Sequence, residues 1–235
     1  TGTVDATGTG RPWVYSSGLR GEGKVYVDLM PSRPVVVSIC ATPPAIDGKL
    51  DDACWQEAQP VPFQNNSHLA EPQTTLLIRR DGQAIYFGYR RKAAIRDGEP
   101  IPFKATLADD DAEVWRDDDF EIFLTDSKRQ VGLQFAVGCG GGRFEGLNAI
   151  PKRDWSDLKW KAPWTHAVSK GADEWIAEVA IPIATLTAEK LDPANLQLNV
   201  MSYNVSNPGR RSIFITDPSP LGFGRCQNFI PIAEK

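Results

Sequence analysis

Short apolar segments with a two-residue period recur along most of this chain, and they constrain its fold more than any other feature. In residues 119–125, Phe120, Ile122 and Leu124 fall on one face and Asp119, Glu121 and Phe123 on the other, as in a half-buried strand. Residues 74–80 and 84–90 flank Asp81-Gly82, a pair typical of a hairpin turn. Further strands are expected at 35–41, 132–138, 175–181, 196–205, 212–216 and 228–232.

Helix signals are scarce in comparison. Only residues 50–58 and 184–191 have the pattern of one or two helical turns. Many short strands, separated by Pro and Gly turns and accompanied by little helix, indicate an all-β fold. We therefore predict a two-sheet antiparallel β-sandwich, jelly-roll-like, with a closed barrel as the lesser alternative.

The first 34 residues differ from the rest of the chain. Residues 1–10 are small and polar without a period, which is typical of a linker. Val25, Val27 and Leu29 then alternate as in an edge strand. The sequence thus predicts an N-terminal arm over residues 1–34 and a sandwich over residues 35–235.

Composition and charge narrow the partners. Hydrophobic residues make up 41% of the 235 residues, enough for a packed core. The net charge of -4 and the absence of a long Lys/Arg run argue against a nucleic-acid partner. No apolar run reaches the roughly 20 residues of a membrane span, so no membrane partner is expected. We expect a monomer or one module of a multidomain chain.

The four cysteines leave two interpretations open. Cys40, Cys54, Cys139 and Cys226 form no Cys-x-x-Cys pair, which argues against a thiolate zinc site or a redox dithiol. They are either buried free thiols or include one or two disulfides formed in an oxidising compartment. Cys40 and Cys54 flank a turn-rich segment and are the first pair to test.

Several segments resemble, in order, the sequences of family 9 carbohydrate-binding modules. They are PPAIDGKLDDACW (43–55), RRDGQAIYFGY (79–89), VWRDDDFEIFL (114–124), EWIAEVAIPIATL (174–186), and a closing series that runs from LQLNVMSYN to the final Phe-Gly (196–224). The resemblance covers about residues 43–232. It implies a secreted or cell-surface β-sandwich that binds a sugar and carries no catalytic residues.

In that family two tryptophans clamp a sugar ring and a glutamate binds its hydroxyls. The resemblance assigns the first clamp to Trp115 and the carboxylate to Glu121. These residue types suit a sugar, because an aromatic face stacks on the C–H side of a pyranose and a carboxylate accepts strong hydrogen bonds from hydroxyls. The alternatives are a core or rim aromatic for Trp115 and a solvated or ion-paired strand residue for Glu121.

The chain departs from the family pattern at two places. Residues 217–224, where the second clamp tryptophan is expected, contain no Trp, and Ala136 replaces an expected basic residue. Trp160 and Trp164, in a segment with a third tryptophan at position 155, are candidate substitutes, although we expect at least one of these three to pack in the core. Asn204, at the end of a strand, is a further ligand candidate. Trp55 and Trp175 are expected in the core.

The remaining residues leave other functions open. Residues 108–121 hold eight acidic side chains, and oxygen-rich loops suit calcium. Asp117, Asp118 and Asp119 are therefore tentative ligands of a structural ion, with a solvated acidic loop as the alternative. A haem-binding electron carrier and a protein–protein adhesion module are the alternative functions, although no haem is expected. The candidate haem ligands are Met30, Met201, His68 and His166.

Overall fold

The computed structural model describes residues 34–61, 64–65, 74–128, 130–149, 157–206, 211–214 and 229–234. The predicted N-terminal arm, apart from Pro34, lies outside these residues and stays a prediction. The strands are β1 (Val35–Ile39), β2 (Gln64–Asn65), β3 (Thr74–Arg80), β4 (Ala84–Lys92), β5 (Ile95–Arg96), β6 (Glu99–Pro100), β7 (Asp119–Asp126), β8 (Val131–Gly138), β9 (Arg143–Ala149), β10 (Thr165–Lys170), β11 (Glu174–Pro182), β12 (Leu196–Asn204), β13 (Arg211–Phe214) and β14 (Ile230–Glu234). The helical turns are α1 (Ala53–Gln56), α2 (Ile183–Ala188), and the 3-10 turns η1 (Val114–Arg116) and η2 (Pro193–Asn195).

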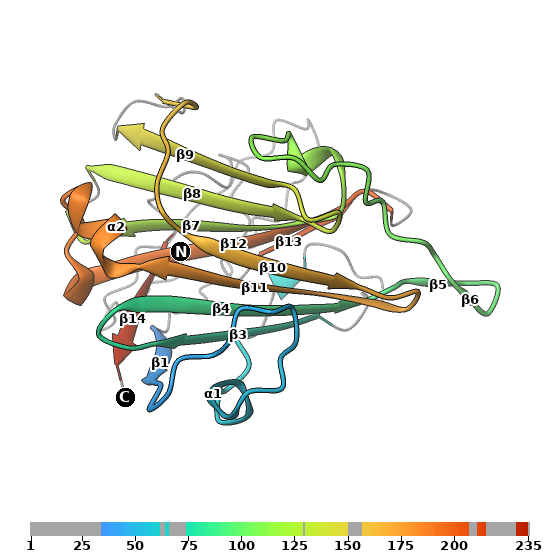
Figure 1. The fold of residues 1–235 in the computed structure, drawn as a ribbon, viewed down its shortest axis with the longest axis horizontal. Coiled ribbons are helices and arrows are strands. Elements are labelled where there is room, and N and C mark those ends of the chain that lie inside the picture. Colours follow the sequence, from blue (N-terminus) through green and yellow to red (C-terminus); the bar gives the residue numbers. More distant parts are fainter. Residues whose placement is uncertain are drawn as a thin grey trace, which may run out of the picture. The chain divides into compact units, whose positions relative to one another are not determined.

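Within the described residues, one large curled sheet contains most of the strands (Figure 1). Its strands follow the order β10-β11-β4-β3-β1-β14-β12-β7-β8-β9. Pairing between neighbours is antiparallel except at β1, which is parallel to both β3 and β14. β1 and β14 thus join the β10-β11-β4-β3 half to the β12-β7-β8-β9 half. The predicted all-β sandwich with two short helices is confirmed, and none of the described helices is long and apolar enough to cross a membrane.

The core between the two halves is built from strand faces with the expected period. Phe120, Ile122 and Leu124 of β7 are completely buried in it. Tyr89 of β4 stacks on Phe120 with ring centroids 4.6 Å apart and lies 4.8 Å from Trp175 of β11. These aromatic contacts join the two halves of the large sheet. The prediction that Trp175 belongs to the core is confirmed.

A second apolar cluster lies on the outer side of β3 and β4. Trp55 of α1 is buried there, as predicted, and rests against Gly88, where an added Cβ would come within 2.7 Å of Leu50. A disulfide joins Cys40 to Cys54, so the first pair chosen for testing is bonded. Cys139 is a buried free thiol, and Cys226 lies outside the described residues.

Glu178 of β11 connects two of the segments that resemble family 9 modules, residues 43–55 and residues 174–186. One carboxylate oxygen accepts hydrogen bonds from the backbone N–H groups of Asp47 (2.9 Å), Gly48 (2.7 Å) and Lys49 (3.2 Å). The other accepts the Trp55 indole N–H at 2.6 Å. Gly48 has a φ of +86°, and a Cβ there would lie 3.1 Å from the β10 backbone. The Asp-Gly turn is therefore folded around this buried carboxylate.

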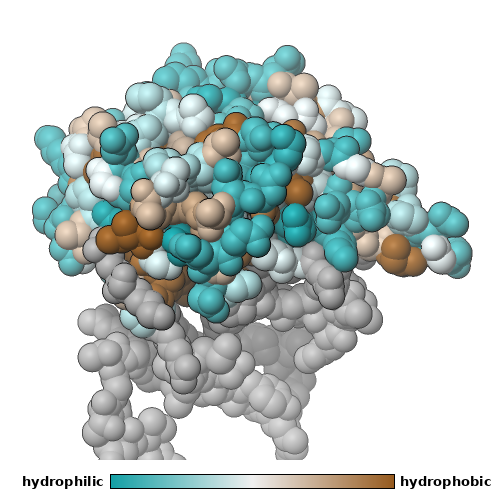
Figure 2. Space-filling model, turned by 60° about the horizontal axis from the view of Figure 1, so that its bottom comes forward, coloured by the Kyte–Doolittle hydropathy of each residue, from teal (hydrophilic) through white to brown (hydrophobic). Residues whose placement is uncertain are grey.

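The surface seen in Figure 2 is mostly hydrophilic, with apolar side chains in small, separate groups. Large apolar residues that are exposed within the described part of the chain are Val36, Ile39, Ile95, Trp115 and Leu158. Isolated apolar side chains are ordinary on a protein surface. Trp115 differs from the other four because it adjoins a set of buried polar groups, which form the candidate site.

Candidate carbohydrate-binding site

Trp115 is presented by the short η1 turn immediately before β7. Val114, its neighbour in the turn, is fully buried against Ala136 and Phe144, and this contact anchors the turn to the sheet. The Trp115 ring stands edge-on to Phe144, with centroids 5.2 Å apart and planes at 84°. It remains 37% exposed. The structure thus gives Trp115 a fixed position with part of the indole open to solvent.

Glu121 lies on the same outer face of the sheet, in one row with the residue that supports Trp115. The pairing register places Met201, Glu121, Ala136 and Phe144 opposite one another on four adjacent strands. Neighbouring strands are roughly 4.8 Å apart, so the backbones of Glu121 and Phe144 are about 10 Å apart. Ala136, covered by Val114, lies between them. Trp115, which rests on Phe144, and Glu121 are therefore on the same face, on either side of the Ala136 position.

The carboxyl group of Glu121 lies next to a second carboxyl group, that of Asp119, which is two residues earlier on the same face of β7. Glu121 is 1% exposed and accepts a hydrogen bond from the Gln134 side-chain amide. Asp119 accepts the Tyr203 backbone N–H at 2.8 Å, while its other oxygen has no donor among the described residues. The contact between the two carboxyl groups becomes a hydrogen bond only when one of them is protonated.

Burial controls the protonation of this carboxyl pair. Loss of solvent raises the pKa of Glu121 to about 7, although hydrogen bonds from Gln134 and Asp119 act in the opposite direction. Burial, together with the charge of Glu121, raises the pKa of Asp119 well above its ordinary value. When the two groups hold one proton between them, Asp119 carries it and donates the hydrogen bond, and Glu121 accepts that bond. Glu121 is thus the hydrogen-bond acceptor of this buried pair.

The acidic residues immediately before β7 accept hydrogen bonds, mostly from the preceding loop. Asp117 accepts hydrogen bonds from the Thr106 hydroxyl and the Leu107 N–H, both at 2.8 Å. Asp118 accepts the N–H groups of Lys104 at 2.8 Å and Ser206 at 3.1 Å. Among the described residues no group of three His, Cys, Asp or Glu side chains has a metal-binding arrangement. This geometry lends no support to calcium at residues 117–119, which stays a prediction.

The other predicted ligand residues lie away from Trp115 and Glu121. Trp164 is 4% exposed and packs on Phe135 at 5.4 Å, on the face of the sheet opposite Glu121. Its indole N–H donates to Glu145 at 3.1 Å. Trp160 is half-buried and contacts Phe135 at 5.9 Å. The expectation that at least one of these tryptophans packs in the core is therefore confirmed by Trp164.

Asn204 also lies on the core side of its strand. It is fully buried and follows Leu198 and Val200 in the alternation of β12, whereas Met201 points to the outer face. The structure thus brings together only Trp115 and Glu121 of the predicted ligand residues. Trp155, Asn207 and residues 217–224 lie outside the described residues.

The sequence did not indicate three further residues of this site: Asp119, Gln134 and Phe144. Gln134 alternates with apolar residues of β8, so the strand period predicts it on the outer face, but only the register shows that it lies near Glu121. Phe144 stands between Arg143 and Glu145, so no apolar period indicates which face it is on. The sequence predicts Asp119 only as a metal ligand, and its contact with Glu121 follows from their i, i+2 positions on one strand.

With the geometry in hand, comparison with known proteins identifies the relatives of this chain. Residues 46–224 match the model of the carbohydrate family 9 binding domain-like family. The chain belongs to this family. The resemblance noted from its sequence is therefore confirmed. A search of curated proteins gives no match.

Solved structures with the same fold are also similar to this family 9 chain. A protein from Bacteroides uniformis has a TM-score of 0.65 at 14% identity, covering 86% of this chain and 99% of that one. A family 9 module from Caldicellulosiruptor kristjanssonii in complex with cellotriose has a TM-score of 0.62 at 15% identity, covering 86% and 94%. A glucose complex of a family 9 module from the same organism has a TM-score of 0.56 at 14% identity, covering 85% and 95%. At these identities the likeness shows the shared fold.

Proposed function

We propose that this chain is a non-catalytic module that binds carbohydrate on the outer face of the β12-β7-β8-β9 half. In this proposal Trp115 stacks on a pyranose ring, and Glu121, supported by Gln134 and Asp119, accepts hydrogen bonds from ring hydroxyls. The observation that carries the proposal is the exposed indole of Trp115, fixed on Phe144 in the same strand row as Glu121.

The proposed ligand is a short glucan or its terminal sugar. The family match and the two Caldicellulosiruptor kristjanssonii complexes, one with cellotriose and one with glucose, support this choice. The tryptophans at 160 and 164 add no second platform on this face.

The proposed location is outside the cell or on its surface. The disulfide between Cys40 and Cys54 supports it, because such bonds form and persist in oxidising compartments. A monomeric module, or one joined to other domains, is part of the same proposal. The competing adhesion and haem functions make different predictions: a haem carrier would show a Soret band, and an adhesion module would ignore soluble sugars.

Calorimetric titration of the chain with cellotriose and glucose tests the proposal. We expect saturable binding that weakens about tenfold in Glu121→Gln, since a hydrogen bond to a charged group contributes on the order of 1.5–3 kcal/mol. Glu174→Gln is the matched control, because Glu174 is a half-exposed strand glutamate on β11. Equal affinity in wild type and Glu121→Gln would remove Glu121 from the site.

A further inference from the structure

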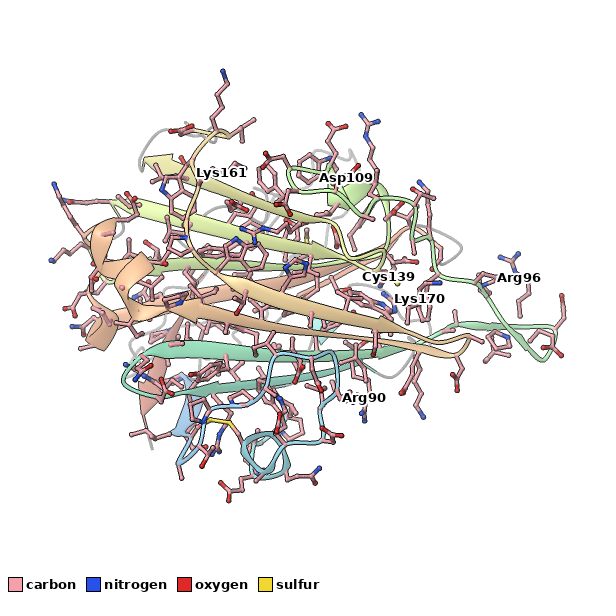
Figure 3. The ribbon with its side chains drawn as sticks, viewed as in Figure 1. Arg90, Arg96, Asp109, Cys139, Lys161 and Lys170 are labelled. Carbon is pink, nitrogen blue, oxygen red and sulfur yellow. A yellow bond between two sulfur atoms is a disulfide. The ribbon has the colours of Figure 1, made fainter. Side chains whose placement is uncertain are left out.

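At the end of the sandwich where β4 ends and β11 begins, the interior changes from apolar to polar. Arg91 follows Ile85, Phe87 and Tyr89 on the core-facing side of β4 and is 2% exposed. It lies directly opposite Trp175 in the pairing of β4 with β11. Figure 3 shows Cys139 and Lys170 at the same end of the sandwich. A guanidinium group is thus enclosed between the sheets.

Two nitrogens of the buried Arg91 guanidinium have no hydrogen-bond partner within the described residues. Its Nε and Nη1 atoms are buried without a hydrogen bond, and so is the Trp175 indole nitrogen. An unpaired buried charge is strongly destabilising, and buried N–H groups in native proteins are nearly always hydrogen bonded. Guanidinium and indole nitrogens are donors only. The missing partner must therefore be an acceptor.

A contact across the sandwich brings a third group to this place. The Tyr89 hydroxyl and the Ser202 hydroxyl are 2.7 Å apart, and Ser202 is 3.4 Å from the Asn204 side-chain oxygen. Arg91 and Asn204 lie two residues beyond Tyr89 and Ser202 on strands that run in the same direction in Figure 1. The Asn204 amide nitrogen is also buried without a partner among the described residues. The carboxamide of Asn204 thus adds a potential donor from the opposite sheet.

Acidic side chains lie in the same region as Arg91, but none of those described forms an ion pair with it. Burial raises the pKa of Cys139 to about 12, and that thiol is influenced by Asp118, Lys170, Asp117 and Arg91, so these groups share one region. Asp117 and Asp118 are the acidic members, but their oxygens already accept hydrogen bonds from the 104–107 loop and from Ser206. Neither forms an ion pair with Arg91 among the described contacts.

We infer that this end of the sandwich binds an anion, either a small inorganic anion or the carboxylate of an acidic sugar, through Arg91, Trp175 and Asn204. A carboxylate or halide matches the donors chemically, because a guanidinium and an indole N–H give strong charge-assisted hydrogen bonds to such a group. The site is separate from the proposed sugar site, since Trp115 and Glu121 lie on the outer face of the opposite sheet. It gives the chain a second ligand, which is recognised by charge.

The test measures the melting temperature and tryptophan fluorescence of the full chain at constant ionic strength. Sodium methanesulfonate is replaced stepwise by chloride, acetate or glucuronate, and glucose serves as the neutral sugar. We expect a saturable rise in melting temperature with at least one small anion or carboxylate, and none in Arg91→Met. A stronger response to glucuronate than to acetate would identify an acidic sugar, and an equal or weaker one a free anion. No saturable response, or the same response in Arg91→Met, would overturn the inference.

Two further variants keep the test decisive. Trp175→Phe removes the indole N–H and keeps a ring, so half-saturation should require about tenfold more anion; an unchanged value would contradict the site even if Arg91→Met does not fold. Trp115→Ala should keep the full anion response. Loss of neutral-sugar binding in Trp115→Ala with an intact anion response would separate the two sites.

Discussion

Two buried glutamates on opposite halves of the sandwich show how differently one residue type can be used. Glu178 accepts four hydrogen bonds, three from backbone N–H groups and one from Trp55. Glu121 accepts one from Gln134 and faces a second carboxyl group, Asp119. Both are almost completely buried. Their surroundings, rather than their exposure, distinguish them.

The difference indicates which glutamate organises the fold and which is available to a ligand. The carboxylate oxygens of Glu178 accept the backbone N–H groups of the 47–49 turn. This side chain is therefore structural. Glu121 has acceptor capacity left and lies in the same strand row as Phe144, on which the exposed indole of Trp115 rests. Burial raises the pKa of both glutamates, and the hydrogen bonds to Glu178 oppose that shift.

The variant Glu178→Gln should show the largest effect, a loss of stability. The amide NH₂ would face N–H donors in place of an acceptor, leaving buried donors unpaired, so the free energy of unfolding should fall by about 3–5 kcal/mol. Urea denaturation measures this, with Glu121→Gln as the isosteric control, for which a loss below about 1 kcal/mol at pH 7 is expected. Equal losses in the two variants would erase the distinction between them.

Removal of the disulfide tests how the turn around Glu178 is held. Cys40 and Cys54 are 14 residues apart, and closing a loop of this length stabilises a fold by about 3 kcal/mol. The double variant Cys40→Ser with Cys54→Ser should lose roughly this amount in urea denaturation. Sugar affinity should stay the same, since the disulfide and Trp115 belong to different halves; a large fall in affinity would contradict this separation.

The pH dependence of stability tests the carboxyl pair at Glu121. A folded-state pKa raised above the unfolded value means that the folded state holds the proton more tightly. Its stabilising effect is therefore complete at low pH and is lost as the pH rises from about 4.5 to about 7. The free energy of unfolding should fall by at most roughly 3 kcal/mol across this window. Glu121→Gln should flatten the curve, and an unchanged slope would show that the pair does not titrate there.

Local patterns in the sequence predicted most of the fold. The alternation in residues 119–125, the Asp-Gly hairpin and the two helical segments reflect short-range physics and are confirmed. The role of Glu178 could not be read in the same way, because its partners lie about 130 residues away in the chain. The same limit applies to Trp164, which lies outside any strand, so no period indicates which face it contacts.

The site was predictable in part for a similar reason. Trp115 and Glu121 belong to one short segment, so the resemblance assigned both to the sugar site, and the strand period placed Glu121 on the face away from the core. Asn204 and the tryptophans at 160 and 164 come from other segments, and their positions depend on how strands pair. Register and packing put them on the core side, away from Glu121.

The most direct measurement is tryptophan fluorescence during titration with cellotriose, in wild type, Trp115→Ala and Leu158→Ala. Leu158 is an exposed apolar residue outside the site and serves as the control for loss of surface hydrophobicity. We predict a saturable signal in wild type and Leu158→Ala, with affinity at least about fivefold weaker in Trp115→Ala, since stacking on an aromatic ring contributes on the order of 1 kcal/mol or more. Unchanged affinity in Trp115→Ala would contradict the proposed site.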